Sequence, residues 1–171
     1  LARVDGRVAV FLEPIALYMA KDLHEAGDGQ WLFPYPEQGQ AMVLGEGRVY
    51  APDADDLVVF TYGNGVPMSL RAARRIEQAH GWKVRVVDLR WLVPLNEAAI
   101  AKHAGECERI LVVDEGRRSE GVITAIAEGG YRSRPFRRVV GADTYTPLAG
   151  AAFLVIPGED DIVAAAAGLA P

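Results

Sequence analysis

The chain has 171 residues, of which 50% are hydrophobic and 24% are charged, and its net charge is −5. This is the composition of an ordinary globular protein, and the acidic balance argues against nucleic acid as a partner. The length allows one domain, or one domain with a fragment of another.

Other simple features narrow the class further. The sequence has no apolar stretch of 18 residues and no basic start followed by a hydrophobic region, so it predicts neither a membrane span nor a signal peptide. Cys107 is the only cysteine, which excludes an internal disulfide and favours a reducing compartment such as the cytoplasm. Because the chain begins with Leu1 in the middle of a pattern, we expect it to be part of a longer protein.

The first third of the chain has an irregular texture. The segment "GRVAVFLEP" (6–14) predicts a strand. Residues 21–39 carry Gly and Pro without hydrophobic periodicity, which indicates a linker or long loop, and we place a domain boundary there. Residues 40–56 then predict a strand that runs into a turn-rich segment.

From Leu57 onward, short apolar runs alternate with helical patterns. The strands are predicted at 57–62, 83–89, 109–115 and 136–142, and the helices near 67–80, 96–106, 120–131 and after Gly158. Right-handed crossovers make such strands parallel, and nearly continuous apolar strands require helices on both faces. The pattern therefore predicts an α/β fold.

A possible nucleotide site lies at Gly63-Asn64-Gly65, between a strand and a helix. Asp88 follows about 20 residues later, where dinucleotide-binding proteins have an acid for the ribose. However, Met68 occupies the position of the third glycine, and Pro67 lacks an N–H that could bind phosphate. The sequence therefore favours a plain strand-to-helix turn.

Gly27-Asp28-Gly29 matches the first part of a thiamine diphosphate motif. That motif requires an Asn some 25 to 30 residues later, but Asp55 and Asp56 stand there, and the nearest Asn is Asn64. The motif should also lead into a helix, whereas this segment leads into "QWLFPYP". We interpret it as a loop.

Carboxylates follow most of the predicted strands. They are Glu13, Asp88, Asp114, Glu115 and Asp143. The carboxyl edge of such a sheet is where ligands bind, but carboxylates there also cap the following helices, and we favour capping.

Two further groups have structural interpretations. His103 and Cys107 are four residues apart on a predicted helix and lack a third orienting group, so we do not interpret them as a catalytic pair. The basic cluster is interpreted as a solvated loop and strand edge; it consists of Arg132, Arg134, Arg137 and Arg138.

Several segments, taken together and in order, resemble a known family. They are "VAVFLEPIALY", "VVFTYGNGVPMSLRAARRIE", "VRVVDLRWLVPLNEAAIAKHA", "RILVVDEGRRSEG" and "VVGADTYTPLA". This order is similar to that in beta subunits of 2-oxoacid dehydrogenases, the thiamine-dependent decarboxylase component in the transketolase superfamily. The resemblance covers residues 8–165, and "VVDLRWLVPL" and "EP..LY" are its most specific parts.

The resemblance implies a domain division. Residues 1–36 would be the tail of a pyrimidine-binding domain with its linker, and residues 37–171 a transketolase C-terminal domain. That domain has a three-layer α/β/α fold with a five-stranded, mostly parallel sheet, whose first strand, here near 41–50, is antiparallel. In the family it serves subunit assembly and docking, and it does not bind the cofactor.

The resemblance also implies a chemistry for the parent enzyme: oxidative decarboxylation of a 2-oxo acid, with transfer of the acyl group to a lipoyl arm. The cofactors would be thiamine diphosphate and magnesium. The family's catalytic and cofactor-binding groups precede Leu1, so no catalytic or cofactor-binding residue carries over, and we expect the fragment alone to be inactive and to bind neither cofactor. "FLEP" and "LVPL" favour the branched-chain type.

Partners and a metal site follow by the same resemblance. The partners would be the rest of the decarboxylase component, the lipoyl acyltransferase core and a second copy in a homodimer, with neither nucleic acid nor a membrane. Asp5 falls on a family position that ligates structural potassium, but Arg7 replaces the accompanying Asn and would repel the ion.

Other functions stay open. The chain could be the C-terminal domain of deoxyxylulose-phosphate synthase or transketolase, or a non-catalytic assembly module. The segment "RRSEGV" fits neither enzyme type closely, because only Gly121 stands where paired glycines are common.

Overall fold

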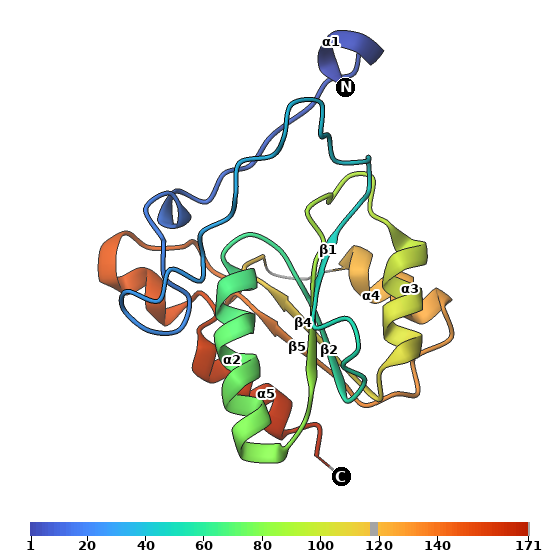
Figure 1. The fold of residues 1–171 in the computed structure, drawn as a ribbon. Helices are drawn as coiled ribbons and strands as arrows, with labels where there is room; N and C mark the ends of the chain where they lie inside the picture. The colour runs from blue at the N-terminus through green and yellow to red at the C-terminus, as the bar shows by residue number, and fades with distance from the viewer. Residues whose placement is uncertain (117–119, 171) are drawn as a thin grey trace.

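A five-stranded mixed sheet forms the middle layer of the computed structural model, which describes residues 1–116 and 120–170 (Figure 1). The strands are β1 (Arg48–Tyr50), β2 (Leu57–Thr61), β3 (Val84–Asp88), β4 (Arg109–Asp114) and β5 (Phe136–Val140). Their order is β1-β3-β2-β4-β5, with β1 antiparallel to β3 and the other neighbours parallel. The predicted fold class, including the single antiparallel strand, is confirmed.

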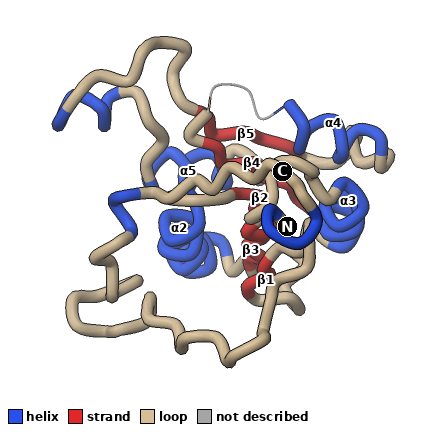
Figure 2. Tube along the Cα trace, turned by 90° about the horizontal axis from the view of Figure 1, so that it is seen from above, coloured by secondary structure: helices blue, strands red, loops and turns tan. Residues whose placement is uncertain are grey.

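Helices cover both faces of the sheet. Figure 2 shows one pair, α2 (Gly65–His80) and α5 (Glu159–Ala167), on one face, and the other pair, α3 (Glu97–Glu106) and α4 (Glu120–Glu128), on the opposite face. Each pair packs over its own hydrophobic cluster. The three layers follow from the alternation of apolar strands and amphipathic helices in the sequence.

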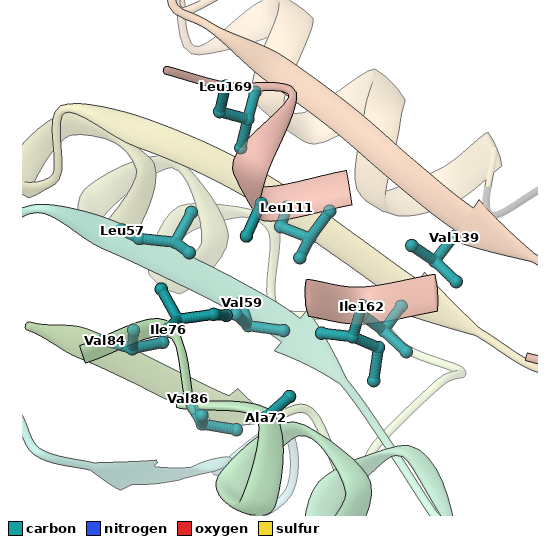
Figure 3. Packing of buried hydrophobic residues seen from close by; sticks show 12 residues of the cluster. Leu57, Val59, Ala72, Ile76, Val84, Val86, Leu111, Val139, Ile162 and Leu169 are labelled. Carbon is teal, nitrogen blue, oxygen red and sulfur yellow. The ribbon is translucent and has the colours of Figure 1, made fainter. Parts of the chain in front are cut away.

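The central strand β2 explains why the strand sequences are continuously apolar. All five of its residues are buried, and successive side chains point to opposite faces. Leu57 and Val59 therefore join the cluster under α2 and α5, which Figure 3 shows, whereas Val58 and Phe60 join the cluster under α3 and α4. A strand that is buried on both faces has apolar residues at successive positions, and its sequence does not alternate between apolar and polar residues.

The helix ends use local side-chain signals. Asn96 accepts a hydrogen bond from the N–H of Ala99 (3.0 Å) and thereby caps α3. At the start of α5, Asp161 accepts one from the N–H of Gly158 (2.8 Å). Helix α2 ends at Gly81, whose φ of 71° suits glycine.

The first 47 residues, here called the arm, precede β1 and contain no strand. They include the short helix α1 (Ala2–Asp5) and the 3-10 turn η1 (Ile15–Leu17). The strand predicted over residues 6–14 is not formed, and Val10 and Phe11 are each 83% exposed. A strand needs a neighbour for its backbone groups, and the structure provides none beside this segment.

The outer strand β5 carries two exposed arginines, Arg137 and Arg138. It forms one edge of the sheet, as β1 forms the other. This position agrees with the prediction that part of the basic cluster lies on a strand edge. Among the described residues, no helix is long and apolar enough to cross a membrane.

Candidate functional site

The carboxyl ends of β2 and β4 bring together side chains that are about 50 positions apart in the sequence. The hydroxyl of Tyr62 donates to Oδ1 of Asp114 (2.5 Å), which also accepts from the N–H of Gly116 (2.6 Å). The side-chain amide of Asn64 donates to both carboxylate oxygens of Glu115 (3.1 and 3.2 Å). The two strands are parallel neighbours, so the turns that follow them meet at this edge.

Tyr62 acts in this edge as a hydrogen-bond donor. Its partial burial and its hydrogen bond to the Asp114 carboxylate raise the pKa of the phenol well above its usual range. The phenol therefore stays protonated near neutral pH, and it links β2 to β4 without supplying a base.

The turn at Gly63-Asn64-Gly65 is shaped by close packing. Gly63 has a φ of +56°, and a Cβ at Gly65 would lie 2.0 Å from Oγ1 of Thr61. Both glycines are thus required by the backbone and by Thr61. Neither requirement involves a phosphate group.

The charges at this turn also oppose a dinucleotide. The carboxylate of Glu115 accepts hydrogen bonds from the side-chain amide of Asn64, the residue just before α2. A phosphate group would bind at this helix start in a nucleotide-binding protein. Pro67 lies in the first turn of α2 and has no N–H to offer. The geometry fits the plain turn favoured by the sequence.

Asp88 stabilises the turn that follows β3. Its Oδ1 accepts from the N–H of Arg90 (3.2 Å), and Oδ2 lies 3.4 Å from Nε of the same residue. Burial raises the pKa of the Asp88 carboxyl, against the opposing effect of Arg90. Helix α3 begins later and is capped by Asn96, so the expectation that Asp88 caps the following helix is wrong.

Other strand-end carboxylates accept local hydrogen bonds. Asp114 accepts the N–H of Gly116 within the turn after β4, and Glu13 accepts the hydroxyl of Tyr18 within the arm. Asp143 lies exposed after β5. The contacts of Asp114 with Gly116 and of Glu13 with Tyr18 are therefore local, within a turn and within the arm.

The segment Gly27-Asp28-Gly29 forms a tight turn, as expected of a loop. The carboxylate of Asp28 accepts four backbone N–H groups at 2.8–3.0 Å; they belong to Leu23, His24, Glu25 and Gln30. These bonds hold the pKa of Asp28 far below its usual range. Because both oxygens are committed to the backbone, this aspartate does not fit the role of a magnesium ligand for thiamine diphosphate.

His103 and Cys107 do not form a catalytic pair. The Cys107 thiol is fully buried, lies 3.5 Å from the carbonyl oxygen of Ala54, and has its pKa raised by burial to about 11. His103 instead places Nδ1 3.0 Å from Nη1 of Arg85. The cysteine is therefore a packing residue.

Arg85 is a buried charge that the sequence interpretation missed. It lies in the apolar strand β3, is 4% exposed, and donates from Nε to the carbonyl oxygen of Ala54 (3.0 Å). It also forms an ion pair with Glu106 near the end of α3. The only signal was Arg85 itself, a basic residue between Val84 and Val86 in "KVRVVDL". Arg85 joins α3 and the loop before β2 to the sheet.

Asp5 lies at the end of α1, and its Oδ2 is 3.9 Å from the N-terminal ammonium group. Within residues 1–116 and 120–170, no group of three His, Cys, Asp or Glu side chains could hold a metal ion. The assignment of Asp5 as a potassium ligand stays a prediction.

The basic cluster divides into different roles. Arg134 donates to the carbonyl oxygens of Cys107 and Gly105 (2.9 Å to the latter). It thereby provides hydrogen-bond donors for carbonyl groups at the C-terminal end of α3, which have no partner within the helix. Arg137 lies on β5, 3.5 Å from the carbonyl oxygen of Gly168. Arg137 fits the expected strand edge, whereas Arg134 is half-buried against the end of α3 and departs from the expected solvated loop.

Exposed apolar side chains are concentrated in three segments: arm residues 4–19, arm residues 32–43 and residues 145–154. They include Val8, Val10, Phe11, Leu12, Ile15, Met19, Leu32, Tyr35, Val43, Tyr145, Leu148, Phe153 and Leu154. Large exposed apolar groups of this kind mark interaction surfaces. The chain therefore offers surfaces suited to association, and we find no catalytic constellation among its described residues.

The sheet order, the single antiparallel strand and the two helix layers define an α/β domain of the transketolase C-terminal type. The family with that description, "Transketolase, C-terminal domain", matches residues 45–160. The chain belongs to this family.

Curated relatives are similar over more than the domain. The 3-methyl-2-oxobutanoate dehydrogenase subunit beta of Mycobacterium tuberculosis (strain ATCC 25618 / H37Rv) is 34% identical over 160 residues, which is 90% of this chain and 42% of the relative. The pyruvate dehydrogenase E1 component subunit beta of Staphylococcus aureus (strain Mu50 / ATCC 700699) is 32% identical over 134 residues, 75% of this chain and 41% of the relative. The chain thus spans less than half the length of these relatives.

Among solved structures, a split gene transketolase, an inactive beta4 tetramer, matches with a TM-score of 0.61 and 22% identity, over 75% of this chain and 43% of that chain. At this identity the likeness concerns the fold alone. It agrees with the fold predicted from the sequence.

Proposed function

We propose that this chain is the C-terminal domain, with the preceding linker, of the beta part of a thiamine diphosphate-dependent 2-oxoacid dehydrogenase. The parent enzyme would decarboxylate a 2-oxo acid oxidatively and pass the acyl group to a lipoyl arm. Within it, this chain would serve subunit assembly and docking. We favour a branched-chain 2-oxo acid as substrate, in keeping with "FLEP" and "LVPL".

One observation carries this proposal. The 34% identity to a 3-methyl-2-oxobutanoate dehydrogenase beta subunit extends over 90% of the chain, which is more than the family domain at residues 45–160. The C-terminal domain alone does not distinguish a transketolase from a dehydrogenase. The likeness that extends into the arm favours the dehydrogenase.

The chemistry of the described residues supports an assembly role. The Asp28 carboxylate is fully used by backbone N–H groups, and the turn before α2 carries the Glu115 carboxylate. Thiamine diphosphate and magnesium would thus bind to another part of the parent enzyme. The exposed apolar side chains of the arm and of residues 145–154 are available for contacts with partners.

The proposed partners are the remainder of the decarboxylase component, a lipoyl acyltransferase core and a second copy of the chain. Residues 1–36 would belong to the end of a pyrimidine-binding domain and its linker, and residues 37–171 to the C-terminal domain. The single cysteine, Cys107, favours a cytoplasmic location.

The test uses the natural gene product that contains this sequence, purified with its partner subunit. With thiamine diphosphate and magnesium, it should decarboxylate 3-methyl-2-oxobutanoate faster than pyruvate, as measured by reduction of an artificial electron acceptor. The isolated 171-residue chain should give no turnover and no heat of binding with the cofactor and magnesium in calorimetric titration.

Three results would contradict the proposal. They are micromolar cofactor binding by the isolated chain, ketol transfer between sugar phosphates by the natural product, or absence of decarboxylation by a natural product that is folded and binds the cofactor.

A further inference from the structure

The linker segment before β1 is built as a closed turn. The N–H of Trp31 donates to the carbonyl oxygen of Lys21 (2.9 Å) and so joins the two ends of residues 21–31. Inside the turn, Asp28 accepts four backbone N–H groups, and Asp22 accepts those of Gly27 and Gly29 (both 2.8 Å). We call residues 21–31 the docking turn.

The docking turn contacts α2. Nη1 of Arg71 lies 3.5 Å from the carbonyl oxygen of Leu23, and Arg74 forms an ion pair with Glu25 (3.5 Å). His24 and Arg74 both line an open cleft of about 520 Å³, which is also lined by residues of the segment 50–54 and by the start of β3. The turn therefore contacts the helix layer through residues that include the half-buried Leu23, while residues such as Ala26 stay exposed.

Arg71 joins three elements. While Nη1 faces Leu23, its Nε donates to Glu159 at the start of α5. A second pair, Arg75 with Asp160 (2.8 Å), also ties α2 to α5 but does not involve the arm. The position of the docking turn is thus coupled to a helix pair that packs on the sheet.

The arm has another attachment just after the docking turn. The guanidinium of Arg48 on β1 lies 4.5 Å from the ring centre of Phe33 and 4.9 Å from that of Tyr50. Phe33 also packs edge to face with Trp31 (5.3 Å between ring centres). A cation held between two aromatic rings stabilises such a contact.

The side chains of residues 4–19 contrast with those of the docking turn. Val8 is 97% exposed and Phe11 is 83% exposed, whereas Leu23, His24 and Asp28 are half-buried. We propose that the docking turn is a latch. It holds the linker on α2 through Arg71 and Arg74 and thereby fixes the point and direction at which the preceding residues leave the domain.

The latch is a property of this chain by itself and does not depend on the proposed activity. A preorganised turn costs less entropy on docking than a flexible linker of the same length. Anything joined to residues 1–20 would then be presented to the domain in a restricted orientation.

The test measures the distance between the docking turn and α2. Spin labels are attached through Ala26→Cys and Gln78→Cys, both at exposed positions, while the buried Cys107 is protected from labelling. Double electron–electron resonance should give one narrow distribution of the distance between the two labels in the folded chain. A broad distribution in this starting protein would overturn the proposal.

Matched variants then separate the latch from general stability. Arg71→Met and Arg75→Met each remove one ion pair with α5, but only Arg71 contacts the docking turn. The distribution should broaden in Arg71→Met and stay narrow in Arg75→Met. Equal behaviour of the two variants would contradict the proposal.

A variant inside the turn covers the case in which Arg71→Met fails to fold. Asp28→Ala removes the acceptor of four N–H groups without touching the core, and Asp53→Ala, at an exposed acid before β2, is its control. Hydrogen exchange at Leu23, His24, Glu25 and Gln30 should accelerate at least tenfold in Asp28→Ala, and the label distance should broaden. Unchanged exchange and distance would refute the latch.

Discussion

Asn64 and Glu115, 51 positions apart, are joined by hydrogen bonds of 3.1 and 3.2 Å at the carboxyl edge of the sheet. The contact fixes the turn after β2 against the turn after β4. It also places a carboxylate at the start of α2, where nucleotide-binding α/β proteins place a phosphate.

This arrangement predicts that the chain does not bind NAD. Phosphate would meet the Glu115 carboxylate and would find no N–H at Pro67. Calorimetric titration with NAD should give only heats of dilution, and Glu115→Gln should not restore binding because Pro67 is still present. Saturable binding in the wild-type chain would show that the turn is a nucleotide site.

Asp88→Ala should lower the free energy of unfolding by about 0.5–1.5 kcal/mol, the usual net contribution of one hydrogen bond. The reason is the loss of the acceptor for the N–H of Arg90. Asp88→Asn should cost less, because the amide oxygen still accepts this bond and no charge is desolvated. Urea unfolding of the two variants measures the difference, and a larger loss for Asn would contradict this account.

Acidification should weaken the fold through His103. Burial and the charge of Arg85 lower its pKa from the ordinary 6.5, so the unfolded state takes up the proton first. Stability is therefore lost as the pH falls below the ordinary value. Glu106 and Lys102 are the other charged groups facing His103; Glu106 opposes the effect of Arg85, and its own pKa is lowered.

Urea unfolding at pH values of about 7.5 and about 5.5, on either side of the ordinary histidine pKa, checks this prediction. His103→Gln should reduce the difference between the two conditions, because it removes the group whose pKa is lowered in the folded state. An unchanged difference in His103→Gln would assign the acid sensitivity to other groups.

Gly65→Ala should destabilise the chain by about 1–3 kcal/mol, in the range of core overpacking. A Cβ there would lie 2.0 Å from Oγ1 of Thr61. The double variant Thr61→Ala/Gly65→Ala should recover much of the loss, because the remaining Cβ of residue 61 would be 3.4 Å away. Thermal melting of the two single variants and the double variant gives the coupling. Additive losses would show that the glycine is required for another reason.

A second copy of the chain is expected to pair through the arm. Deletion of residues 1–36 should weaken the dimer, since it removes the exposed apolar side chains at 4–19, and should leave residues 41–171 folded. Light scattering measures the mass, and circular dichroism checks folding. A monomeric intact chain, or an unfolded truncated one, would contradict the prediction.

Most of the domain fold could be predicted from the sequence, because the hydrophobic pattern of each strand and helix is local. The apolar runs located β2 to β5, and the resemblance supplied the antiparallel strand. Residues 6–14 were misjudged because an apolar alternation does not show whether a neighbouring strand is present to accept its hydrogen bonds.

The contacts between side chains could not be predicted from the sequence as well as the fold could. The contact between Asn64 and Glu115, and the links from Arg85 to Ala54 and Glu106, join positions that are distant in the sequence. Which backbone N–H groups donate to Asp28 depends on the path of the turn and not on residue type. Hydrophobic periodicity predicts neither these hydrogen bonds nor the long-range side-chain contacts.

The two exposed arginines on β5 restrict how copies of this chain can associate. An outer strand of a sheet attracts other strands by its free N–H and C=O groups, and long cationic side chains oppose that approach. If a second copy brought its own β5 alongside, Arg137 and Arg138 would face the same charges across the seam. Continuous sheets across two molecules are therefore disfavoured at this edge, and we expect any association of two copies to use the exposed apolar side chains of the arm and of residues 145–154.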